Sequence, residues 1–107
     1  MRRTNQSYAR RCSKLMEAIN VMSAIGVVVR KVDVEATPVP VLWVFTSPAL
    51  YRNQGNAIGS ITDLGRSRDA RTKTAECLGC EVRWLEPLGF AMARTPKRLN
   101  TSTLSRG

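Results

Sequence analysis

The sequence predicts a small α/β protein of the α+β class, in which two helices pack on a three-stranded sheet in the chain order α-β-β-α-β. The 107 residues leave room for one hydrophobic core. Apolar residues first recur every three or four positions and later alternate, as expected where a helix is followed by strands. Gly26 and Gly79 each mark a predicted helix end, and an apolar segment follows each of them.

The first helix is expected over residues 7–24. Its apolar stripe consists of Tyr8, Cys12, Leu15, Ile19 and Met22. Gly26 then supplies the left-handed conformation that ends many helices, and β-branched residues follow it. A strand should therefore begin directly after this glycine.

The next two elements are predicted to form a β-hairpin. The first strand, over 27–35, has Val28, Val32 and Val34 on one face and Lys31, Asp33 and Glu35 on the other. Arg30 interrupts the apolar face, and we expect its stem to reach the sheet edge, with a position near a partner as the alternative. The second strand, over 41–46, follows a short connection that contains prolines.

The second half of the domain is predicted to add a helix and a strand. Residues 47–66 form a long connection with one short helical turn, capped by Ser47 and Pro48. A second helix is expected over 67–78 and ends at Gly79. The closing strand, over 80–86, has Cys80, Val82 and Trp84 on one face.

The aromatic residues of the strands are expected in the core beneath the two helices. Trp43, Phe45 and Trp84 share this prediction, with a base-stacking platform on an open sheet as the alternative. The opposite face would then expose an apolar surface for a partner protein or for a second copy of the chain. This predicted partner interface consists of Val27, Val29, Leu42, Val44 and Leu85.

The net charge of +9 is concentrated at the two ends of the chain. Residues 1–14 hold five bases and residues 87–107 hold four, without any acid, whereas residues 15–86 hold eight of each. We therefore expect a basic arm (1–6), a domain (7–86) and a basic flexible tail (87–107). The arm and the tail would attract polyanions without a fixed binding geometry. Ends that only improve solubility are the alternative. The predicted nucleic-acid-binding residues are Arg2, Arg3, Arg10, Arg11, Arg66, Arg68, Arg71, Lys73, Lys97 and Arg98.

Most catalytic chemistry lacks its usual residues. The chain has no His, which is the commonest general base and zinc ligand, and it has no Walker or dinucleotide motif. We therefore expect no enzymatic activity, no metal and no cofactor. The Cys77-Leu78-Gly79-Cys80 segment would close a helix, where the dipole disfavours a thiolate, so we expect two packed core cysteines.

The cysteine count and hydropathy bear on location. An odd number of cysteines, three, without a signal peptide predicts reduced thiols in the cytoplasm. No apolar run approaches the ~18 residues of a membrane-spanning helix, so we expect no membrane association.

Two resemblances follow from these elements. The closing helix and strand, over 75–84, resemble those of a bacterial-type KH RNA-binding domain, but Gly55-Asn56-Ala57-Ile58-Gly59 departs from the GxxG spacing of that family. The chain also resembles short uncharacterised phage and mobile-element proteins over residues 10–86, through Leu42-Trp43-Val44 and a Gly-Cys-x-Val-x-Trp segment at 79–84. The second resemblance implies an accessory role and transfers no activity.

These observations predict a non-enzymatic accessory protein, of a phage or mobile element, that binds nucleic acid or an acidic protein surface. The basic arms would supply affinity, and the bases of the second helix would supply placement. The alternative is a protein-interaction module, or an inhibitor of a host protein, that uses the apolar sheet face. A homodimer through that face is the remaining possibility.

Overall fold

The computed structural model describes residues 5–90 and shows an α+β fold. The elements are α1 (Asn5–Ile25), β1 (Val29–Asp33), β2 (Val41–Val44), α2 (Pro48–Arg52), β3 (Thr62–Arg66), β4 (Ala70–Cys77) and β5 (Cys80–Pro87). The predicted class is confirmed, but within these residues the sheet has five strands instead of three. Most of the predicted arm and tail lies outside the described residues.

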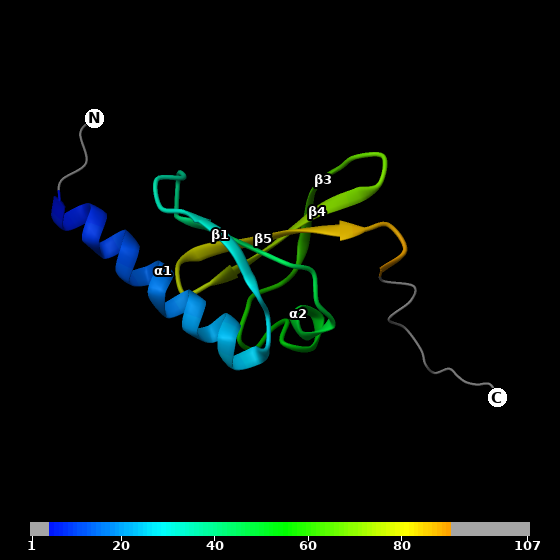
Figure 1. The fold of residues 1–107 in the computed structure, drawn as a ribbon, viewed down its shortest axis with the longest axis horizontal. Helices are drawn as coiled ribbons and strands as arrows, with labels where there is room; N and C mark the ends of the chain where they lie inside the picture. Colours follow the sequence, from blue (N-terminus) through cyan, green and yellow to red (C-terminus); the bar gives the residue numbers. More distant parts are fainter. Residues whose placement is uncertain (1–4, 91–107) are drawn as a thin grey trace.

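The five strands form one mixed sheet in the order β1-β2-β5-β4-β3. The predicted β1–β2 hairpin is confirmed, and β5 pairs antiparallel with β4, which in turn pairs antiparallel with β3. Only β2 and β5 are parallel among the described strands. Figure 1 shows the β3–β4 hairpin projecting from the sheet on the side away from α1.

The first helix begins and ends close to its predicted bounds. Gly26 has a φ of 83° and ends α1, as expected. Leu15, Ala18 and Met22 are buried against the sheet, whereas Tyr8 is exposed. Figure 1 explains the difference, because the first turns of α1 extend past the edge of the sheet.

The second predicted helix is wrong, because residues 70–77 form β4. Leu78 and Gly79 both have positive φ and form the two-residue turn between β4 and β5, so Gly79 ends a strand and not a helix. The short helical turn expected at Ser47 and Pro48 is present as α2, and the Ser47 hydroxyl accepts a hydrogen bond from the Ala49 N–H (3.2 Å).

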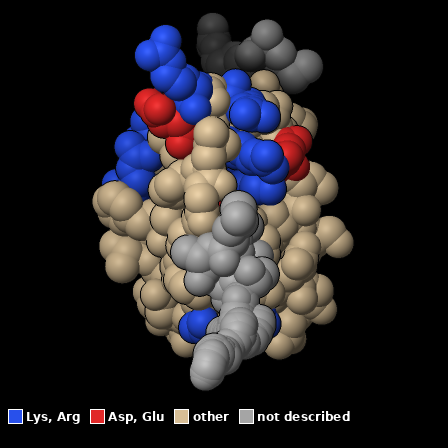
Figure 2. All heavy atoms as spheres, turned by 90° about the vertical axis from the view of Figure 1, so that its right-hand side faces the viewer, with Lys and Arg blue, Asp and Glu red and all other residues tan. Residues whose placement is uncertain are grey.

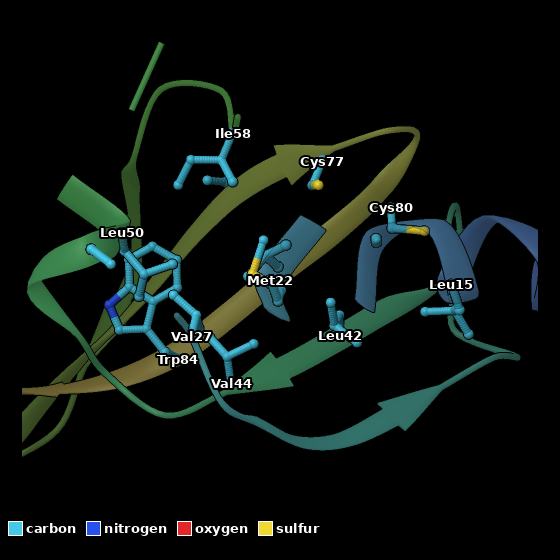
Figure 3. Close-up of a cluster of buried hydrophobic side chains, with 14 residues drawn as sticks. Leu15, Met22, Val27, Leu42, Val44, Leu50, Ile58, Cys77, Cys80 and Trp84 are labelled. Atoms are coloured by element: carbon cyan, nitrogen blue, oxygen red, sulfur yellow. The ribbon is translucent and has the colours of Figure 1, made fainter. Parts of the chain in front are cut away.

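The hydrophobic core lies between one sheet face and both helices. Trp84 is fully buried at its centre, beside Met22 of α1 and Leu50 of α2. Figure 3 shows these side chains together with Leu42 and Val44 of β2. Both helices therefore cover the same face of the sheet, and no helix within residues 5–90 covers the other face.

The two faces of β2 are the reverse of the prediction. Leu42 pairs with the buried Val82 of β5 and lies in the core, so Trp43 and Phe45 point to the uncovered face. Of the three aromatic residues expected in the core, only Trp84 is there. The relative phase of two strands depends on their register, which neither strand shows by itself.

The faces of β1 change phase within the strand. Val29 pairs with Val44 and Lys31 pairs with Trp43, so Arg30 is an extra residue in a β-bulge. The alternation expected for β1 therefore holds after the bulge and is reversed before it. Val27, expected on the exposed face, is buried, whereas Val28 is exposed.

Candidate nucleic-acid interface

The β3–β4 hairpin brings four of the predicted binding residues to one end of the molecule. We call this cluster the basic tip; it consists of Arg66, Arg68, Arg71 and Lys73. Figure 2 shows Lys and Arg side chains gathered over this end, with acidic side chains among them. The sequence placed these bases on a helix, whereas the structure holds them on two paired strands and the turn between them.

Within the basic tip, Arg66 and Arg71 are direct cross-strand partners. Side chains at such positions lie on the same face and about 5 Å apart at Cβ, and like charges there destabilise a hairpin. Arg68 lies in the turn that joins the two strands, so three arginines lie at the end of the hairpin. The repulsion between opposed arginines in this arrangement opposes folding.

Asp63 neutralises part of the cluster. Its carboxylate forms ion pairs with its cross-strand partner Lys73 and with Arg71 (3.8 Å). The hydrogen bond from Lys73 lowers the pKa of Asp63, with smaller contributions from the charges of Lys73 and Arg71. Among residues 5–90, neither Arg66 nor Arg68 has an ion-pair partner within 4 Å, so these two are the unpaired cations of the basic tip.

The other predicted binding residues divide into three groups. Arg10 is exposed on α1. Arg11 donates hydrogen bonds to the carbonyl oxygens of Val34 (2.9 Å) and Ala36, which ties α1 to the end of β1. Arg11 therefore has a structural role in this fold. The remaining predicted bases, Arg2, Arg3, Lys97 and Arg98, lie outside the described residues.

The predicted apolar partner interface is not an exposed surface. Val27, Leu42 and Val44 are buried in the core, and Val29 is half-buried against it. Only Leu85 lies on the uncovered face, where half of its surface is exposed. This prediction is wrong because the bulge in β1 and the register of β2 turn these residues toward the helices.

The uncovered face instead carries aromatic and basic side chains. We call it the open face; it consists of Arg30, Lys31, Trp43, Phe45 and Arg83. The Lys31 ammonium lies 5.7 Å and the Arg83 guanidinium 5.9 Å from the Trp43 ring centroid, and Arg30 lies 5.7 Å from that of Phe45. Phe45 is 54% exposed and Trp43 is half-buried.

The sheet geometry explains how three cations reach these rings. Lys31 and Arg83 are the pairing partners of Trp43 on the two flanking strands, so all three form one row across the sheet. The β-bulge adds Arg30 next to Lys31, and re-aiming a side chain is a common consequence of a bulge. Arg30 thus lies on the edge strand β1, with its guanidinium over the Phe45 ring.

Two neighbouring features complete the open face. Glu81 accepts hydrogen bonds from Arg83 Nε (2.5 Å) and from the Thr74 hydroxyl (2.9 Å), and the Arg83 bond lowers the pKa of Glu81.

A groove of about 350 Å³ lies beside Phe45, at the lower end of the size range of ligand pockets. Its lining residues are Arg30, Val44, Phe45, Thr46, Leu85 and Pro87.

The two cysteines of the CxxC segment are buried, as expected. Cys77 and Cys80 face each other at the β4–β5 turn without a disulfide, and burial raises the pKa of Cys77 to about 11. Burial also raises the pKa of Cys80. Within residues 5–90, no cluster of three metal-ligating side chains occurs, and no helix is long and apolar enough to cross a bilayer.

One buried charged residue had no sequence signal. Glu86 is 3% exposed, and its Oε1 accepts hydrogen bonds from the Tyr51 hydroxyl (2.7 Å) and from the Trp84 indole N–H (3.2 Å). These bonds join α2 to β5. The glutamate supports the core beneath the sheet and lies on the helix-covered face, away from the open face.

Comparison of the chain with family models, with curated proteins and with solved structures gives no match. The function is therefore inferred from the geometry of this chain.

Proposed function

We propose that the chain is a non-enzymatic accessory protein that binds nucleic acid, with the basic tip as its contact to phosphates. The resemblance to short phage and mobile-element proteins is consistent with an accessory role. We expect it to act in the cytoplasm, where its free cysteines stay reduced.

The cross-strand pair Arg66–Arg71 is the observation that carries this proposal. Two guanidinium groups in direct register cost stability, and a bound phosphate removes that cost by placing a negative charge between them. Arg68 extends the cluster at the turn, and bidentate hydrogen bonds to phosphate oxygens are characteristic of arginine. The chain's net charge of +9 favours the approach of any polyanion.

Fluorescence anisotropy with a labelled duplex of about 20 base pairs tests the proposal over roughly 50 to 200 mM salt. The double variant Arg66→Gln/Arg68→Gln should bind more weakly and reduce the slope of log K against log salt by about two, because each lost phosphate contact removes about 0.9. The matched control is Lys14→Gln/Arg52→Gln, which removes the same charge from exposed positions outside the tip.

The two variants have the same net charge, so any difference between their affinities shows the effect of where the two charges were removed. Equal losses in both would mean that binding depends only on total charge, and the basic tip would then have no special role. Absence of wild-type binding at 50 mM salt would contradict the proposal as a whole. In that case a protein-interaction role for the exposed Val28, Phe45 and Leu85 becomes the leading explanation.

A further inference from the structure

The open face presents two aromatic rings at a spacing that suits one kind of nucleic acid. Trp43 lies in β2, and Phe45 directly follows this strand and donates its N–H to the Val28 carbonyl (2.9 Å), so their Cα atoms are about 6.6 Å apart at the rise of an extended chain. Stacked bases of a duplex are 3.4 Å apart per strand and are hidden within it. Only an unstacked single strand can place neighbouring bases on both rings.

The surrounding charge matches the same ligand. Lys31 and Arg83 flank Trp43, and Arg30 lies against Phe45. A backbone that carries its bases to these rings would therefore have a cation within reach on each side. Stacking on an aromatic ring combined with a cationic surface for the phosphates is the general chemistry of single-strand binding.

The cations now over the rings do not prevent stacking. Lys31 is exposed, and the Arg83 Nε bond to Glu81 uses one of five guanidinium donors. Cation–π contacts at exposed sites are weaker than base–aromatic stacking. An incoming base can displace the cations from the ring faces, and they then pair with phosphates.

We propose that the open face is a binding site for single-stranded nucleic acid, with Trp43 and Phe45 stacking two neighbouring bases and Arg30, Lys31 and Arg83 contacting the backbone. The inference deepens the nucleic-acid role proposed above, on which it rests. It assigns strand selectivity to the sheet, whereas the basic tip contacts phosphates of single and double strands alike.

Matched single-stranded and duplex oligonucleotides of about 20 nucleotides test the open face. Trp43→Leu should weaken single-strand binding roughly 5- to 150-fold, the loss expected for one stacked base, and should leave duplex binding unchanged. Tyr8→Leu is the matched control, because it removes an exposed aromatic ring from α1, and it should change neither affinity.

Two further measurements keep the test independent of any loss of folding. The single strand should quench tryptophan fluorescence in the wild type but not in Trp43→Phe, whose remaining indole is the buried Trp84. Glu81→Gln removes the acid beside Arg83 and should tighten single-strand binding roughly two- to fivefold.

The outcomes separate the two proposals. Equal affinity for both oligonucleotides, no quenching and no effect of Trp43→Leu would overturn the open-face site, while binding that still depends on the basic tip would leave the broader proposal standing. Loss of all binding in the wild type would overturn both. If the open-face site is overturned while binding through the basic tip remains, a protein is the remaining candidate for the occupant of the open face.

Discussion

Replacing Arg66 with glutamine is expected to stabilise the protein and weaken its binding to nucleic acid. Arg66 lies directly opposite Arg71, and opposed like charges cost about 0.2–1 kcal/mol in a sheet. Arg66→Gln keeps the length of the side chain and removes the repulsion. For a domain of this size the gain corresponds to a rise in Tm of about 1–8 °C.

The effect on binding has the opposite sign. One lost phosphate contact should reduce the slope of log K against log salt by about 0.9 for a duplex. The two effects arise from the same guanidinium group, because the charge that opposes folding is the charge that attracts phosphate.

Thermal unfolding and salt-dependent anisotropy on the same samples check this pair of effects. Arg68→Gln is the control, because Arg68 lies in the turn without a cross-strand partner. It should weaken binding to a similar degree and change the free energy of unfolding by less than about 0.5 kcal/mol. A lower Tm for Arg66→Gln, or an unchanged salt slope, would refute the reasoning.

Three further predictions concern the fold. Arg11→Ala should lower the free energy of unfolding in urea by about 1.5–3 kcal/mol, because it removes hydrogen bonds from a cation to backbone carbonyls, whereas the exposed Arg10→Ala should stay within about 0.5 kcal/mol. Tyr51→Phe removes the hydroxyl that donates to the buried Glu86 and should cost about 1–3 kcal/mol in the same assay; a loss below 0.5 kcal/mol would contradict the assigned bond. Stability should fall by up to about 1.4 kcal/mol per pH unit between pH 9 and about pH 11, because the folded Cys77 thiol keeps its proton while the unfolded one releases it near pH 9. Cys77→Val should remove this part of the pH dependence, and an identical pH profile in the variant would argue against it.

The elements with a clear period were predictable from sequence. The stripe of α1 ends at Gly26, and the closing strand buries Val82 and Trp84 as its alternation indicated. Both features depend on local patterns, which a single segment shows by itself. The burial of both cysteines was also predicted. The prediction placed them at the end of a helix, whereas they flank the turn between β4 and β5.

The errors arose where pairing decides structure. Residues 70–77 carry charged and small side chains that suit a helix as well as a strand, and the alternating Thr72 and Thr74 were the only strand signal. All residues of β3 are exposed, so that strand has no hydrophobic pattern to detect. Its hydrogen bonds to β4 are what place it in the sheet.

In the candidate sites too, local patterns were predictable from sequence, whereas features that depend on strand pairing were not. The bases of the basic tip were identified from sequence, but their convergence required the hairpin that was missed. An open sheet face with Trp43 and Phe45 was only the alternative to their burial in the core, because the phase of β2 depends on its register with β5 and that of β1 on a bulge. Glu86 gave no signal, since its partners Tyr51 and Trp84 meet only in the folded protein.

The salt dependence of nucleic-acid binding by the full chain tests the central claim most directly. We predict measurable binding near 50 mM salt and a linear fall of log K with log salt, since binding by Lys and Arg releases counterions from the phosphates. Absence of binding at low salt, or an affinity that does not change with salt, would contradict a role in contacting nucleic acid.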